Sequence, residues 1–259
     1  MANWQDPRDT AERTGGVSAA TVGVPRAARD VGLRSYMLSV YNYMASGVLL
    51  TGIVALLFVR SPFFASAFRV VETPGGAALQ PTLLGWAITF SPLLFVMAMS
   101  FGQMRMRTGT LQAMFWGFAV AMGLSLSTIF IAYTGVSIAQ TFFATAAAFM
   151  GLSLWGYTTK KDLSGWGTFL IMGVVGLFVA MLINLFLQST AMDLMISAIG
   201  VLIFAGLTAY DTQKIKSIYQ AVAGHGEAMT RTAIMGALNL YLDFINMFLF
   251  LLRFMGDRR

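Results

Sequence analysis

Residues 232–252 read TAIMGALNLYLDFINMFLFLL, and the assignment of the fold starts from them. This stretch is long enough to span a bilayer, because about 20 apolar residues cross the hydrocarbon core as a helix. Its only charged residue is Asp243. A carboxylate at bilayer depth costs about 2.5–3.5 kcal/mol on insertion scales, so such a residue usually faces a partner or a water-filled path. The stretch therefore predicts a membrane helix with one candidate functional acid.

A second acid, Asp211, ends the uncharged run Leu194–Tyr210. If a helix begins at Asp193, a rise of about 1.5 Å per residue places Asp211 roughly 27 Å further along its axis. That position is near a membrane face, with Lys214 and Lys216 just beyond it. Two interpretations remain open here, namely a functional acid and an interfacial residue paired with one of these lysines.

The composition indicates an all-α polytopic membrane protein. Hydrophobic residues make up 57% of the chain and charged residues only 11%, which is outside the range of soluble domains. We expect one membrane domain over 35–256, preceded by a polar tail over 1–34 that is disordered and cytosolic. The absence of cysteine excludes disulfides and thiolate chemistry, and a single histidine, His225, argues against a histidine metal site. Seven hydrophobic helices are expected near 35–59, 83–104, 110–133, 137–157, 166–187, 193–213 and 232–253.

The basic residues are distributed unevenly between the expected loops. Twelve fall in the tail and in the loops at 105–109, 158–163 and 214–231, whereas the loops on the other side carry only Arg60 and Arg69. Such an excess marks the cytosolic side, so we expect a cytosolic N-terminus and no nucleic-acid partner. The three arginines after the last helix leave its topology open. The charge rule favours re-entry, whereas its apolar length favours spanning.

Polar and small residues lie on one face of each acid-bearing helix. On the last helix the spacing is 3, 4 and 3, and on the preceding one it is 3, 8 and 3, which keeps each set on a single helical face. Either set can serve as a helix–helix seam. An asparagine seam needs no carboxylate, however, so we favour a functional face. The two sets are Gly236, Asn239, Asp243 and Asn246, and Ser197, Gly200, Thr208 and Asp211.

The segments Ala209–Lys216, AYDTQKIK, and Leu238–Asn246, LNLYLDFIN, resemble the Bax inhibitor-1 (TMBIM) family, including its bacterial YccA-like members. The resemblance covers about residues 35–256. It implies six helices around a central, C-terminal one. It also implies a pH-sensitive calcium leak channel in the inner (plasma) membrane, with Asp211 and Asp243 as the pH sensor in the pore. An arginine of the second helix that latches onto the first aspartate matches Arg105, with Arg107 as the fallback.

The residues are compatible with weak calcium binding. Calcium takes six to eight oxygen ligands, and two carboxylates supply at most four, so Asp211 and Asp243 would hold the ion transiently. Conduction requires such weak binding. Asn239 and Asn246 are expected to add oxygens on the pore face. We expect no cofactor, with calcium as the permeant ion.

Two other classes of protein share some of these sequence features. Paired membrane aspartates also occur in intramembrane aspartyl proteases, where two carboxylates share a proton. Those enzymes carry Gly-x-Gly-Asp, whereas Leu240 and Leu242 occupy the glycine positions before Asp243, so we expect no enzyme. The resemblance also implies an alternative function, a regulatory protein that binds and modulates a membrane-bound ATP-dependent protease, with residues 1–34 as the contact.

Overall fold

The computed structural model describes the backbone of residues 26–73 and 76–258 and the side chains of 30–71 and 79–258. Seven helices in these ranges are long and apolar enough to cross a membrane, which confirms the polytopic fold. The elements are α2 (Arg26–Val59), α3 (Phe64–Ala67), β1 (Phe68–Thr73), β2 (Gly76–Pro81), α4 (Leu83–Gly102), α5 (Thr108–Leu126), α6 (Ile129–Ala132), α7 (Gly135–Thr158), α8 (Ser164–Leu187), α9 (Thr190–Val222) and α10 (Gly226–Met255).

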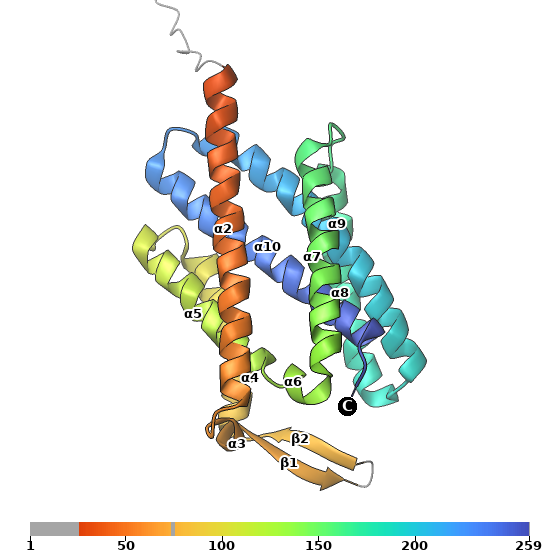
Figure 1. Ribbon diagram of the computed structural model, residues 1–259. Helices are drawn as coiled ribbons and strands as arrows, with labels where there is room; N and C mark the ends of the chain where they lie inside the picture. The colour runs from red at the N-terminus through yellow and green to blue at the C-terminus, as the bar shows by residue number, and fades with distance from the viewer. Residues whose placement is uncertain (1–25, 74–75, 259) are drawn as a thin grey trace, which may run out of the picture.

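The C-terminal helix α10 is the centre of the bundle. In its most apolar 18 residues 67% are buried, against 11–33% for the other six spans. Helices α2, α5, α7 and α9 pack on it directly, whereas α4 packs mainly on α5 and α8 on α9. Figure 1 shows α10 crossing the bundle obliquely behind α2 and α7. The expected central helix is therefore confirmed, with four of the six surrounding helices as its main neighbours.

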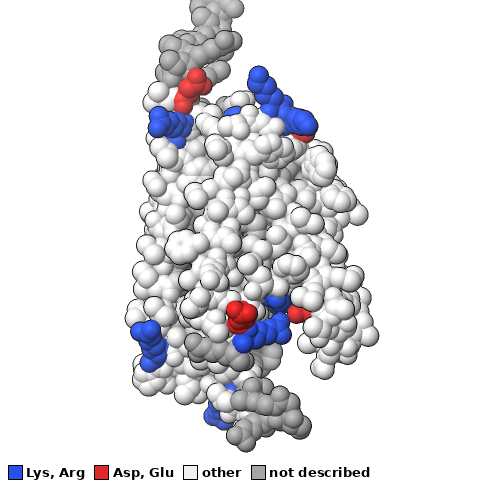
Figure 2. Space-filling view, turned by 45° about the vertical axis from the view of Figure 1, so that its right-hand side comes forward, with Lys and Arg blue, Asp and Glu red and all other residues white. Residues whose placement is uncertain are grey.

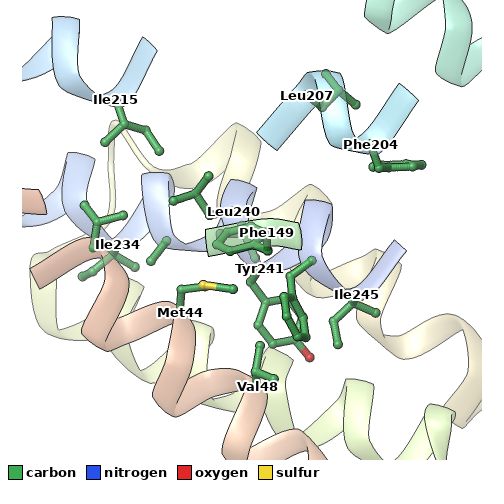
Figure 3. Close-up of a cluster of buried hydrophobic side chains, with 14 of the residues drawn as sticks. Met44, Val48, Phe149, Phe204, Leu207, Ile215, Ile234, Leu240, Tyr241 and Ile245 are labelled. Carbon is green, nitrogen blue, oxygen red and sulfur yellow. The ribbon is translucent and has the colours of Figure 1, made fainter. Parts of the chain in front are cut away.

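Apolar side chains of α2, α5, α7 and α9 form one core around α10. Figure 3 shows Met44 and Val48 of α2 and Phe149 of α7 close to the α10 side chain of Tyr241. Tyr241 is fully buried. Because burial of an apolar side chain contributes about 1.5–3 kcal/mol in water-exposed proteins but far less against lipid, this core depends on close packing rather than on exclusion of water.

The loops separate into two ends of the bundle. The basic end contains the α4–α5, α7–α8 and α9–α10 loops, and the hairpin end contains β1, β2 and the C-terminus. Figure 2 shows charged atoms at both ends and an uncharged band between them on the visible face. This band has the character expected of a bilayer-embedded surface.

The structure resolves the topology of the last helix. Arg253 and Arg258, at and after the end of α10, lie 3.6 and 3.3 Å from the carboxylate of Asp193, near the start of α9. The backbone of Asp257 also exchanges hydrogen bonds with Thr134 and Ser137 at the α6–α7 turn. The helix therefore runs from the basic end to the hairpin end, as a spanning helix does, and its C-terminal arginines lie at the hairpin end.

Three boundaries differ from the sequence expectations. Helix α2 begins at Arg26, so residues 26–34, which we assigned to a disordered tail, are helical; residues 1–25 lie outside the described part. Helix α9 continues to Val222 and α10 begins at Gly226, because polar helical turns extend both helices beyond their apolar stretches. The antiparallel pair β1–β2, with Phe68 opposite Pro81, was not expected at all.

Candidate functional site at the α9–α10 seam

Two glycines set the register between α9 and α10. Gly200 of α9 lies under the ring of Phe250, and Gly236 of α10 receives the side chain of Ile215. Because the two helices are antiparallel, a residue of α9 and a residue of α10 lie at the same level along the seam when their residue numbers add up to about 450. The expected small-residue stripe on α9 does pack against a neighbouring helix, and that neighbour is α10.

This register places the two acids in series along the seam. Asp211 lies level with Asn239 and Leu240, about one helical turn closer to the basic end than Asp243. At about 1.5 Å per residue the axial offset is roughly 5 Å. Asp211 shares its face of α9 with Gly200 and Ile215, and Asp243 shares its face of α10 with Gly236 and Phe250, so both acids lie on the surfaces that meet along the seam.

Asp243 is the most unusual side chain of the core. Only 4% of its surface is exposed, and its Oδ2 atom has no hydrogen-bond partner among the described residues. A buried polar atom without a partner costs about 1–3 kcal/mol, and more if it is charged. Structural polar residues in membrane helices are normally hydrogen-bonded to a neighbouring helix. The environment of Asp243 thus differs from that of a structural seam residue.

Residues adjacent to Asp211 anchor α9 to its neighbours. The ring of Tyr210 occupies the space left by Gly167 on α8. The side chain of Gln213 accepts a hydrogen bond from the Leu163 amide at 2.8 Å and donates to the Lys161 carbonyl at 2.8 Å, which fixes the α7–α8 loop. These contacts orient the helical turn so that Asp211 faces α10.

A chain of hydroxyl groups adds a third anchor on the same turn. Thr212 donates to the Thr208 carbonyl at 2.7 Å, so its single proton is used and its oxygen accepts from Ser153 at 2.9 Å. Ser153 in turn accepts from Tyr41 at 2.6 Å. This hydroxyl chain, from Tyr41 through Ser153 and Thr212 to the Thr208 carbonyl, links α2, α7 and α9.

Tyr241 fixes the helical turn that carries Asp243. Its hydroxyl lies 2.7 Å from Thr51 Oγ1, which itself donates to the Ala119 carbonyl at 2.8 Å, so Tyr241 is the donor. Its ring meets Phe118 edge-on, with centroids 4.9 Å apart. Residues on α2 and α5 therefore hold α10 on the side away from α9.

An aromatic stack closes the seam beyond Asp243. Phe250, seven residues after Asp243 and so on the same face of α10, stacks on Phe204 of α9 at 5.8 Å between centroids and an interplanar angle of 26°. Both rings are at least 92% buried. In this structure the seam is consequently blocked on the hairpin side of the two acids.

The remaining predicted site residues lie around the seam without joining the two acids. Asn239 and Asn246 are half-buried, and the Asn246 amide donates to the Leu242 carbonyl of its own helix at 2.8 Å. Arg105 and Arg107 are exposed at the α4–α5 loop. No ion pair within the described side chains joins either arginine to Asp211, so the latch stays a prediction. Those side chains contain no cluster of three or more His, Cys, Asp or Glu that would hold a metal ion.

The sequence missed several residues that position the acids. Gln213 and Thr212 lie inside the Ala209–Lys216 motif, so their proximity to Asp211 was a usable signal. Thr51, Tyr41 and Ser153 gave no comparable signal, because each is a single hydroxyl in an apolar helix and its partner lies 59 to 190 residues away.

The fold and this seam define an integral membrane protein with two acids facing each other inside a helical bundle. A family profile described as "Inhibitor of apoptosis-promoting Bax1" matches residues 33–259. The chain belongs to this family, the Bax inhibitor-1 family, as its two motifs indicated.

Bacterial proteins match this chain over nearly their full length. The inner membrane protein YbhL of Escherichia coli K12 is 42% identical over 229 residues, which cover 88% of this chain and 94% of that protein. An uncharacterized protein of Rickettsia prowazekii is 45% identical over 89% of this chain and 92% of its own length. One of Caulobacter vibrioides is 44% identical over 89% and 91%.

Proposed function

We propose that this protein is a pH-sensitive calcium leak channel of the inner membrane, in which ions pass along the α9–α10 seam and Asp211 and Asp243 are both ion ligands and pH sensor. The observation that carries the proposal is the buried Oδ2 of Asp243, which has no hydrogen-bond partner among the described residues. If the side chain at position 243 served only to pack the helices together, an apolar residue there would make the bundle more stable.

The arrangement of the acids supports transient cation binding. Asp211 is half-buried towards the basic end and Asp243 is buried one turn further in. A cation moving from the basic end would meet the two carboxylates in sequence, and passage between neighbouring weak sites favours conduction. Asn239, level with Asp211, is positioned to supply a further oxygen ligand. The inner-membrane location is proposed from the relative YbhL, whose name states it.

The two acids also make flux sensitive to protons. Each proton that binds a carboxylate removes a negative charge and one cation ligand. Because the two carboxylates repel one another, they exchange protons as a coupled pair rather than independently. Flux through the seam is therefore expected to change with pH.

Calcium flux into liposomes that contain the purified protein, measured across a series of pH values, tests the proposal. We expect a pH-dependent leak in the wild type and a flattened profile in both Asp211→Asn and Asp243→Asn. Asp193→Asn, which alters an acid at the hairpin end, is the matched control and should keep the wild-type profile. A wild-type protein without calcium flux at any pH would exclude the channel. An unchanged profile in either seam variant would leave that acid a structural contact.

Arg105 is proposed to latch onto Asp211 in a closed state that differs from this structure, in which the arginine is exposed at the α4–α5 loop. Formation of the pair requires the loop to move towards α9. An arginine–carboxylate pair shielded from water is stronger than the roughly 0–1 kcal/mol of an exposed pair. Arg105→Ala should therefore raise the basal leak in the same liposome assay. A raised leak in Arg107→Ala alone would assign the role to Arg107.

A further inference from the structure

A groove of about 700 Å³ lies between α2 and α7, outside the α9–α10 seam. Figure 1 shows these two helices side by side in front of α10. Phe244 of α10 and Phe149 of α7 contribute to its apolar floor, and their ring centroids are 5.6 Å apart. On α2 the lining runs from Arg34 to Leu49. At about 1.5 Å per residue this is roughly 22 Å, which exceeds half of the hydrocarbon thickness of about 30 Å.

The polar lining of the groove is confined to the half near the basic end. It consists of Arg34 and Tyr41 on α2 and of Ser153 and Tyr157 on α7. The half near the hairpin end is lined by apolar side chains alone, such as Leu49 and Phe142. A groove with a polar mouth and an apolar interior matches an amphiphile that lies parallel to the helices.

The mouth of the groove carries basic side chains, with one acid, Asp30, a helical turn before Arg34. Arg34 is exposed, and no ion pair among the described side chains joins it to a carboxylate. Lys216 lies next to the mouth, where its Nζ atom donates to the Tyr157 carbonyl at 2.7 Å and sits 4.8 Å from the centre of the Tyr157 ring. An ammonium group has three donors, so Lys216 retains the capacity to bind an anion.

The interior hydroxyls, in contrast, are already occupied. Tyr41 donates to Ser153, and Ser153 donates to Thr212. Below the mouth, the hydroxyl donors of the groove wall therefore already have acceptors. An acyl chain can lie against this wall without leaving a donor unpaired.

From this combination we infer that the groove is a binding site for one phospholipid of the leaflet at the basic end, with its phosphate between Arg34 and Lys216 and one acyl chain between α2 and α7. Basic side chains at the mouth of a cleft between membrane helices attract lipid headgroups, and anionic ones more strongly. The site is independent of ion conduction by the seam.

A photoreactive benzoylphenylalanine at position 45, where Ala45 is exposed in the groove wall, identifies the occupant without presuming it. The protein is reconstituted in vesicles of phosphatidylcholine with an equal share of phosphatidylglycerol, irradiated and analysed by intact mass. The matched control carries the probe at Gly176 on α8, where a side chain would meet open space. We expect one phosphatidylglycerol adduct as the main product at position 45 and a mixture in the vesicle ratio at position 176.

The headgroup contact is tested in the same assay with Arg34→Gln. Its phosphatidylglycerol adduct at position 45 should fall by about five-fold, the factor expected for one basic residue near an anionic headgroup, and Arg34→Lys should restore most of it. Circular dichroism of each variant verifies the fold. Equal lipid ratios at positions 45 and 176 would overturn the inference. A covalent dimer, or an adduct to a peptide from residues 1–25, would also overturn it by identifying a second copy or the N-terminal segment as the occupant.

Discussion

Gly200 of α9 lies directly beneath the phenyl ring of Phe250 on α10, where a Cβ atom would be only 2.6 Å from Cγ of that ring. This contact brings the two helix backbones together and fixes the level at which Asp211 faces Asp243. The absence of a side chain at residue 200 is thus a condition for the arrangement of the acids.

Gly200→Ala is expected to destabilise the protein by about 1–3 kcal/mol, the usual cost of overpacking. The ring of Phe250 is stacked on Phe204 and cannot move aside freely. Gly176→Ala on α8 is the control, because its Cβ meets nothing within 4 Å and alanine is the better helix former by up to about 1 kcal/mol. Unfolding in a detergent series, followed by circular dichroism, compares the two. Equal stability of both variants would contradict the close approach at Gly200.

Removal of the Thr51 hydroxyl should cost more than removal of the Tyr241 hydroxyl. Tyr241→Phe deletes a donor and leaves Thr51 bonded to Ala119, so we expect a loss near the average of about 0.6 kcal/mol for membrane hydrogen bonds. Thr51→Val leaves the buried Tyr241 hydroxyl without its acceptor, which costs about 1–3 kcal/mol.

The double variant Thr51→Val with Tyr241→Phe provides the decisive comparison. Because no unpaired hydroxyl remains in it, it should be no less stable than Thr51→Val alone. Strict additivity of the two losses in the same unfolding assay would show that the hydroxyls do not interact.

Phe250→Ala is expected to raise the calcium leak if the stack with Phe204 closes the seam below Asp243. Phe248→Ala is a matched control, because both rings are 7% exposed but Phe248 packs towards Phe142 of α7. Loss of either ring should lower stability to a similar extent, because each leaves a cavity in the packed core. Liposome flux separates the two, since only Phe250→Ala should increase it. Equal flux in the two variants would remove the stack as a barrier.

The hairpin end and the basic end are expected to face opposite sides of the membrane. The chain has no native cysteine, so Lys160→Cys and Asp257→Cys each create a single labelling site. A membrane-impermeant maleimide should label residue 257 in intact cells and residue 160 only after permeabilisation, because twelve basic residues mark the cytosolic side. Labelling of residue 160 in intact cells would reverse this orientation. Labelling of both sites from one side would contradict a spanning α10.

The sequence contained enough information for the seven spans and for the inward direction of Asp243. Both depend on local quantities, namely apolar length and helical period, and a charged residue in an apolar span has few other places to point. The sequence did not predict the β1–β2 hairpin, because its second strand, GAALQP, is as uncharged as the helix that follows it. The expected end of α9 was too early and the expected start of α10 was too late, since residues such as Lys216 and Glu227 continue a helix without any hydrophobic signal.

The partners of the acids were harder to predict than the acids themselves. The register of α9 against α10 depends on which glycine accepts which ring, and a single sequence offers several candidates for each. The Tyr41–Ser153 hydrogen bond joins residues 112 positions apart, and nothing in either local sequence indicates the pairing. Arg105 was placed by resemblance alone, and its exposed position here leaves the latch to experiment.

The direction of the hydroxyl chain has a consequence for proton traffic. Each hydroxyl in it donates its hydrogen bond in the same direction, from Tyr41 to Ser153, from Ser153 to Thr212 and from Thr212 to the Thr208 carbonyl. An amide carbonyl accepts a hydrogen bond but does not take up and pass on a proton near neutral pH. The hydroxyl chain therefore connects three helices but does not relay protons, although it ends next to Asp211. Because the buried Phe204–Phe250 stack lies on the hairpin side of the acids, the proton route that the proposed function requires is expected along the seam from the basic end.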